Sequence, residues 1–229
     1  RGQIRPDRVT LVAAEARLRD EATHLFLHDC WFDFNDSFQL LISSASWIDL
    51  SRVRAIAELA TAGKGAIDVS ITAKYENPRI VGHFVGNDCS VAGFDTERCD
   101  LTVELKDLVL SFTGNNLVYR SIHTNGSRVS INFNKDPIEV LFLFNHVSGS
   151  VADIGGVLRT KLPEFNGRFS FTAEGRYADH LTSLNGTAQV EKAQWRGVLL
   201  ADHLALSFAD DGDLLRVKKG TITRGDSFF

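Results

Sequence analysis

Strict alternation of apolar and polar residues is the main local pattern of this chain. In residues 66–74, AIDVSITAK, the apolar residues Ile67, Val69 and Ile71 alternate with polar ones. Because successive side chains of a β-strand point to opposite faces of a sheet, this pattern predicts a strand with one apolar and one polar face.

The same alternation recurs along the whole chain. Its further apolar positions are Leu101, Val103 and Leu105; Val129, Ile131 and Phe133; Phe169 and Phe171; and Leu204, Leu206 and Phe208. The longest apolar run, VLFLF at residues 140–144, predicts a buried strand. Clusters such as LNG at residues 184–186 contain residues that favour turns. Together these features predict an all-β chain of antiparallel strands.

Two segments predict short helices. The sequence DLSRVRAIAELATAGKG, which starts at Asp49, spaces apolar residues at helical intervals, and Gly63 would end that helix. A second, weaker helix follows Ser150, where Gly155 and Gly156 lower the helix propensity. The predicted fold class is therefore all-β with one or two short helices.

The strands that follow the two helical segments resemble each other. Gly65 aligns with Gly167, and Ile67 aligns with Phe169. Self-similarity at a spacing of about a hundred residues predicts a repeat of one short helix followed by several strands.

This repeat predicts the domain organisation. Residues 1–48 would end a preceding β repeat, residues 49–148 would form a helix plus β-strand repeat, and residues 149–229 would form a second, truncated repeat. We therefore expect the chain to be an internal fragment of a longer repeat array.

Composition and charge exclude several classes of protein. The hydrophobic content of 44% and charged content of 24% are typical of a folded chain. The formal net charge is -4, and neither sign forms a run that would bind a nucleic-acid backbone. No apolar stretch approaches the length of a membrane-spanning helix, so any anchor would lie outside this sequence.

Two cysteines are candidates for a disulfide. Cys89 and Cys99 flank the predicted turn at Gly93 and could lie on neighbouring strands. In an oxidising compartment a disulfide between them would stabilise the hairpin, and the alternative is a pair of buried free thiols. The bond requires that the two side chains reach each other, which cysteines on opposite faces of a sheet could not do.

Other residues that could carry chemistry are dispersed. His24, His28 and Cys30 share a strand face, but their spacing along a strand is too wide for one metal ion. The remaining histidines and carboxylates match no catalytic motif. We therefore expect no catalytic residue, no metal and no cofactor, and we do not expect an enzyme.

One segment matches the rhythm of a known family. Residues 65–105 contain Asn77-Pro78-Arg79-Ile80-Val81-Gly82, then Gly93-Phe94, then Leu101-Thr102-Val103-Glu104-Leu105. This succession resembles the AsmA-like superfamily, most closely its translocation and assembly module (TamB) family. The resemblance covers about residues 40 to 229 and includes the helical segment before the first strand block.

The resemblance implies a fold and a function. The expected fold is an elongated, antiparallel-rich β-sheet curled into an open, taco-like groove. The expected location is the periplasm of a Gram-negative-type envelope, with an inner-membrane anchor outside this fragment. The implied function is to carry phospholipid between the inner and outer membranes, and a TamA-type outer-membrane β-barrel is an expected partner.

The alternation identifies the residues that would line such a groove and contact phospholipid acyl chains. They are Ile67, Val69, Ile71, Leu101, Val103, Leu105, Val129, Ile131, Phe133, Phe169, Phe171, Leu204, Leu206 and Phe208. Alternation does not say what covers an apolar face, so two other readings stay open. One is a scaffold for outer-membrane protein assembly or secretion, and the other is a structural β-sandwich or adhesin module.

Overall fold

Antiparallel β-strands dominate the computed structural model of this chain. It describes residues 1–17, 23–52, 62–74, 77–91, 94–157, 164–210, 215–225 and 227–228. The strands are β1 (Gly2–Ile4), β2 (Arg8–Arg17), β3 (His24–Asp33), β4 (Ser37–Asp49), β5 (Ala62–Lys74), β6 (Asn77–Val91), β7 (Phe94–Lys106), β8 (Val109–Tyr119), β9 (Ile122–Thr124), β10 (Ser127–Asn132), β11 (Glu139–Ser150), β12 (Phe165–Ala178), β13 (His180–Trp195), β14 (Val198–Asp210), β15 (Leu215–Arg224) and β16 (Ser227–Phe228). The predicted all-β class is confirmed.

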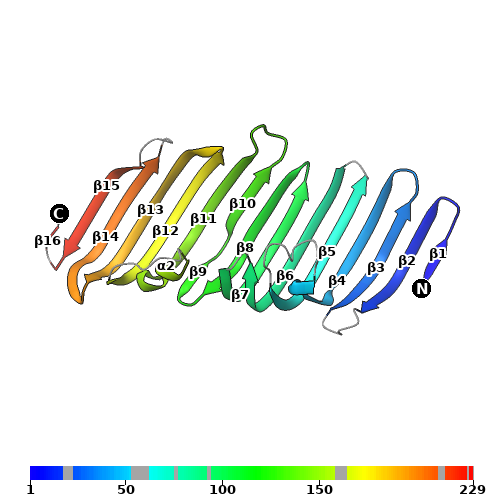
Figure 1. Cartoon of the computed structure of the whole chain (residues 1–229), viewed down its shortest axis with the longest axis horizontal. Helices are drawn as coiled ribbons and strands as arrows, with labels where there is room; N and C mark the ends of the chain where they lie inside the picture. Colours follow the sequence, from blue (N-terminus) through cyan, green and yellow to red (C-terminus); the bar gives the residue numbers. More distant parts are fainter. Residues whose placement is uncertain are drawn as a thin grey trace. The chain divides into compact units, whose positions relative to one another are not determined.

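The chain forms two compact units, Arg1–Thr113 and Gly114–Phe229, which are described separately. In the first unit each strand pairs with its neighbour in the chain, in the order β1 to β8. In the second unit the order is β8-β10-β11 and onward to β16, and β9 pairs with β8 and β11 (Figure 1). The boundary between the units lies within β8 and does not coincide with the predicted repeat boundaries after residues 48 and 148.

The first predicted helix lies mostly outside the described residues, which omit 53–61. The described part is a single 3-10 turn, η1 (Leu50–Arg52). Asp49 Oδ1 caps this turn by accepting hydrogen bonds from the Ser51 backbone N–H at 3.0 Å and the Ser51 hydroxyl at 2.6 Å. Gly63, predicted to end the helix, lies in β5 instead.

The second predicted helix is confirmed as α2 (Val151–Val157), which begins directly after β11. It packs on the sheet through a cluster that contains Val147, Val151 and Phe169. Two glycines cost a helix of this kind roughly 1–2 kcal/mol relative to alanine, so its stability depends on this packing.

Cross-strand pairing in the first unit confirms the predicted alternation. Ile67 lies opposite Phe84, which lies opposite Leu101 on the next strand. Because directly opposed residues of antiparallel strands share a face, these residues point to the same side of the sheet. We call this side the apolar face of the unit and the other side its polar face.

The second unit has an apolar face defined in the same way. Phe171 lies opposite Ala188, which lies opposite Leu206. The prediction for Phe133 is wrong, because β10 ends at Asn132 and Phe133 lies in the following turn with 46% of its surface exposed. The pairing of Asn132 with Glu139 closes the β10–β11 hairpin and excludes Phe133 from the sheet.

The prediction that VLFLF forms a fully buried strand is also wrong. These residues belong to β11, where Leu141 is 44% exposed and Leu143 is 45% exposed. Both lie on the polar face, since Leu141 is opposite Ser130 and Leu143 is opposite Arg128. A strand of this composition is normally covered on both faces, whereas this side of β11 is open in the described structure.

Each unit is a single layer of sheet in its described part. Most contacts between elements join strands that neighbour each other in the sheet (Figure 1). In addition, η1 contacts β5, and α2 contacts β11 and β12. Within the described ranges of either unit, no second sheet packs against the apolar face. Within either unit the described residues therefore form one sheet layer and not a closed sandwich.

The two units share a β-bulge at corresponding places. In β6, Asp88 has a φ of 50° opposite Gly63, and in β13 Lys192 has a φ of 49° opposite Gly167. Both glycines also have positive φ, 120° and 148°. The shared bulge aligns Gly63 with Gly167. The predicted alignment of Gly65 with Gly167 is therefore displaced by two residues.

Glycines inside the strands make room for aromatic rings. Asn185-Gly186, predicted as part of a turn, lies within β13, and Gly186 is opposite Phe208. A Cβ atom at Gly186 would come within 2.5 Å of the Phe208 ring. Phe142 packs over Gly175 in the same way, and Phe84 of β6 packs over Gly65 of β5. Glycine therefore serves close cross-strand packing here, not chain reversal.

The bulge predicts a position-specific cost for alanine. In Gly63→Ala the new Cβ would lie 2.8 Å from the Cys89 Cα, at a φ that favours glycine, so we expect a loss of about 1–3 kcal/mol in the free energy of unfolding. Gly82→Ala is the matched control, because its Cβ would lie 3.7 Å from the nearest atom, Val69 Cγ2. Urea unfolding followed by circular dichroism measures both, and equal losses would contradict the role of the bulge.

Candidate functional site

The apolar face of the second unit consists of rows of side chains that run across neighbouring strands. One row joins Phe144, Ala173, Gly186 and Phe208 through direct cross-strand pairs. A second row, separated from the first by the row of Phe171, Ala188 and Leu206, joins Phe169, Val190, Leu204 and Ile222. Neither row contains a charged or hydrogen-bonding side chain, so these two rows offer only apolar contact, whereas Tyr177 and Asp210 lie elsewhere on the same face.

Several large side chains on this face are exposed. Val217, which pairs with Phe208, is 64% exposed, and Ile222, which pairs with Leu204, is 42% exposed. Phe144 is 36% exposed. A contiguous apolar surface of this kind usually marks a site of interaction.

Aromatic contacts make the surface continuous between β11 and β12. The ring centroids of Phe142 and Phe144 are 5.5 Å apart, and those of Phe144 and Phe171 are 6.1 Å apart in an edge-to-face arrangement. Phe171 stacks on Phe169 at 6.0 Å. Such aromatic pairs contribute stability in addition to that of the apolar area they bury. The surface between β11 and β12 is therefore well packed.

Helix α2 covers one end of this face. Phe169 is only 7% exposed because it packs against Val147 and Val151. Phe171 and Ile154 border the same cluster. Of the predicted lining residues, Phe169 is therefore covered by protein, which the alternation in the sequence could not indicate.

The other predicted lining residues share the apolar face of their own unit, apart from Phe133. All of them are partly buried between their neighbours in the sheet. In the first unit they are Ile67, Val69, Ile71, Leu101, Val103 and Leu105, and in the second unit they are Val129, Ile131, Phe171, Leu204, Leu206 and Phe208.

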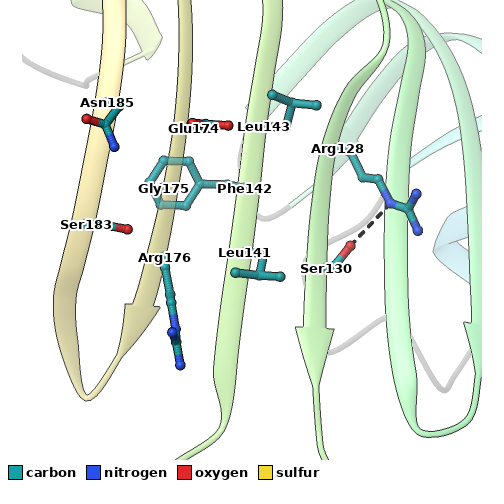
Figure 2. Close-up of a pocket in the computed structure, with 10 residues that line it drawn as sticks. All are labelled: Arg128, Ser130, Leu141, Phe142, Leu143, Glu174, Gly175, Arg176, Ser183 and Asn185. Atoms are coloured by element: carbon teal, nitrogen blue, oxygen red, sulfur yellow. Dashed lines mark hydrogen bonds between the residues drawn. The ribbon is translucent and has the colours of Figure 1, made fainter. Parts of the chain in front are cut away.

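A depression of about 460 Å³ lies on the polar face of the second unit (Figure 2). Leu141 and Leu143 line it, with Arg128 and Arg176 on either side of them in the view. Arg176 pairs with Glu139, which is only 8% exposed. This depression was not predicted from the sequence, although the apolar run of residues 140–144 was a signal that both faces of β11 are apolar.

Cys89 and Cys99 are buried free thiols, with exposures of 1% and 5%. Their side chains hydrogen-bond to each other, and burial raises the pKa of both thiols, that of Cys99 to about 11. They are not cross-strand partners, because Cys89 lies opposite Thr96 and Cys99 lies opposite Gly86. The structure thus has the two cysteines as buried free thiols, which is the alternative to the disulfide.

A charged cluster crosses the polar face of the first unit. His83 Nε2 is 2.9 Å from Asp100 Oδ1, and His83 Nδ1 is 3.4 Å from Asp68 Oδ2. The hydrogen bond to Asp100 raises the pKa of His83, against the opposing effect of desolvation, and Asp68 adds a smaller increase. The cluster links β5, β6 and β7 on the side away from the apolar face.

Other kinds of site are absent from the described part of the chain. No group of three or more His, Cys, Asp or Glu side chains there could hold a metal ion, and this includes the segment with His24, His28 and Cys30. Among the same residues, no helix has the length and apolarity needed to cross a lipid bilayer.

Comparisons with known proteins give no relative. No protein-family model matches the chain, and no match was found among curated proteins or solved structures.

The His83 cluster predicts a pH dependence of stability. Because the pKa of His83 is raised, its stabilising contribution is fully present below the ordinary histidine pKa of about 6.5 and is lost as the pH rises through the higher folded value. Titration of the His83 ring by NMR should show a larger fall of this pKa in Asp100→Asn than in Asp68→Asn. Equal titration curves for the three proteins would contradict the assignment.

Proposed function

We propose that the apolar face binds phospholipid acyl chains and that this chain is a segment of a bridge that carries phospholipid between two membranes. One observation carries the proposal. In both units a predominantly apolar sheet face lacks a second layer of protein over it in the described residues, apart from α2.

Such a face suits acyl chains for a physical reason. Transfer of a hydrocarbon chain from water to an apolar surface is favourable by about 0.8 kcal/mol for each buried CH₂ group. The rows through Phe208 and Leu206 offer no hydrogen-bonding side chain that would hold one position of the ligand. An acyl chain would thus be bound without being fixed, as transport along a surface requires.

The two units resemble each other in strand pairing, and this supports a ligand-binding surface that recurs in each unit. Strands β5 and β6 share with β12 and β13 the same pairing and the same bulge. The first unit keeps its own apolar row of Ile67, Phe84 and Leu101. A ligand surface that recurs in each unit suits a long ligand path better than a single closed pocket would.

The resemblance to the AsmA-like superfamily is the basis for the proposed cellular location and partner. On this resemblance we propose that the chain lies in the periplasm, as part of a protein anchored in the inner membrane, with an outer-membrane β-barrel of the TamA type as a partner. The curled groove belongs to the same proposal. Two further depressions of the second unit are lined by polar-face residues such as Thr187 and Ser207.

Site-specific crosslinking tests the proposal. A photo-reactive phenylalanine analogue replaces Phe208 on the apolar face or, as the matched control, Ser207 on the polar face. The purified chain is then irradiated with phosphatidylethanolamine–phosphatidylglycerol vesicles that contain a tagged phosphatidylethanolamine. We expect capture at position 208 to exceed capture at position 207 at least tenfold, about 1.4 kcal/mol of preference. Equal or absent capture would contradict lipid binding by this face.

A second candidate function, a scaffold for outer-membrane protein assembly, is favoured by the depression on the polar face. Leu141 and Leu143 are about half exposed there, on a strand in the interior of the sheet (Figure 2). Exposed leucines between arginines suit contact with another protein. The double substitution of Leu141 and Leu143 by serine would abolish such contact and leave lipid capture at position 208 unchanged.

A further inference from the structure

Helix α2 is fixed to the second unit by one carboxylate. Asp153 Oδ2 accepts hydrogen bonds from the Ser121 hydroxyl at 2.6 Å and from the Ser121 backbone N–H at 3.4 Å. Arg120 Nη1 lies 3.6 Å from Asp153 Oδ1. The Ser121 hydroxyl also accepts a hydrogen bond from the Ser150 backbone N–H at 2.8 Å, at the end of β11. The turn after β8, the end of β11 and α2 are thereby held together.

Apolar packing holds the other side of the helix. Val151 is 6% exposed, and Ile154 packs beside it against the cluster around Phe169. Gly156 lies against the Tyr119 hydroxyl, where any side chain would collide with the phenol. The helix therefore fits closely on the end of the sheet and makes the contacts with Phe169 that an acyl chain would otherwise make.

The cover is local. Phe169 belongs to the same row as Leu204 and Ile222, and its exposure is 7% whereas that of Ile222 is 42%. Leu204 and Leu206 on β14 are partly buried and are not among the residues packed on the α2 cluster. The apolar face of the second unit is thus divided into a part covered by α2 and an open part on β14 and β15.

We propose that α2 is a fixed stop on the apolar face of the second unit, so that acyl chains bind beside Leu206 and Phe208 and do not reach Phe169. This inference rests on the proposed function. The stop confines a ligand to the side of β14 and β15, and Asp153 and Ser121 act as positioning residues for it. The ligand class is the hydrocarbon chain of a phospholipid.

The test compares capture of tagged phosphatidylethanolamine at positions 169 and 208, with the photo-reactive analogue at either position in the full chain. We expect capture at position 169 to be at least tenfold below that at position 208, about 1.4 kcal/mol. Releasing the helix with Asp153→Asn or Ser121→Ala should raise capture at position 169 severalfold and leave position 208 unchanged. Glu164→Gln is the control, because Glu164 is exposed and pairs only with Arg196 among its described ion pairs.

Hydrogen exchange of the unmodified chain gives a second readout that does not depend on the analogue at a buried position. Vesicles should protect amides of residues 204–208 and leave residues 168–170 unchanged. Equal capture at both positions, equal protection of both segments, or released variants that still exclude lipid from position 169 would overturn the stop. Absence of capture at both positions would overturn the proposed function itself, and with it this inference.

Discussion

An apolar sheet face has to be kept from water, and this constraint governs both units. Strand alternation concentrates Ile67, Leu101, Leu206 and Phe208 on one side of their sheets, while hairpin connections leave each sheet a single layer in its described part. A sandwich would meet the constraint with a second sheet. Here α2 meets it over a short part of one unit, and the remaining apolar surface requires a cover that the described residues do not supply.

The strands themselves are adapted to this arrangement. Aromatic rings pack over glycines on neighbouring strands, as Phe142 does over Gly175 and Phe208 does over Gly186. Side chains of the same sheet therefore pack closely on this face without a second layer. Charged groups such as the His83 cluster lie on the opposite side and join strands there. The bulges at Asp88 and Lys192 recur in the two units with a glycine opposite each. The apolar surface is thus a consistent product of local pairing.

Much of this architecture could be predicted from sequence, because a period of two in apolar residues reports directly on strands and faces. The predicted faces of β5, β7, β12 and β14 are correct for this reason, and so is the helix after Ser150. Glycine was less informative: Gly186 signals a turn by composition but serves ring packing, and Gly63 serves a bulge. Tertiary cover could not be predicted, since no local pattern shows that α2 buries Phe169 or that both faces of β11 are partly open. The hairpin that excludes Phe133 likewise depends on the pairing of Asn132 with Glu139.

We propose that lipid supplies the missing cover of the apolar face. Native mass spectrometry of the chain purified from bacterial membranes and soluble fractions without detergent tests this most directly. We expect phospholipid-sized adducts on the folded chain that disappear when Leu206, in the open part of the face, is replaced by glutamate. A folded, monomeric chain that carries no lipid, takes up none from vesicles and binds no hydrophobic dye would contradict it.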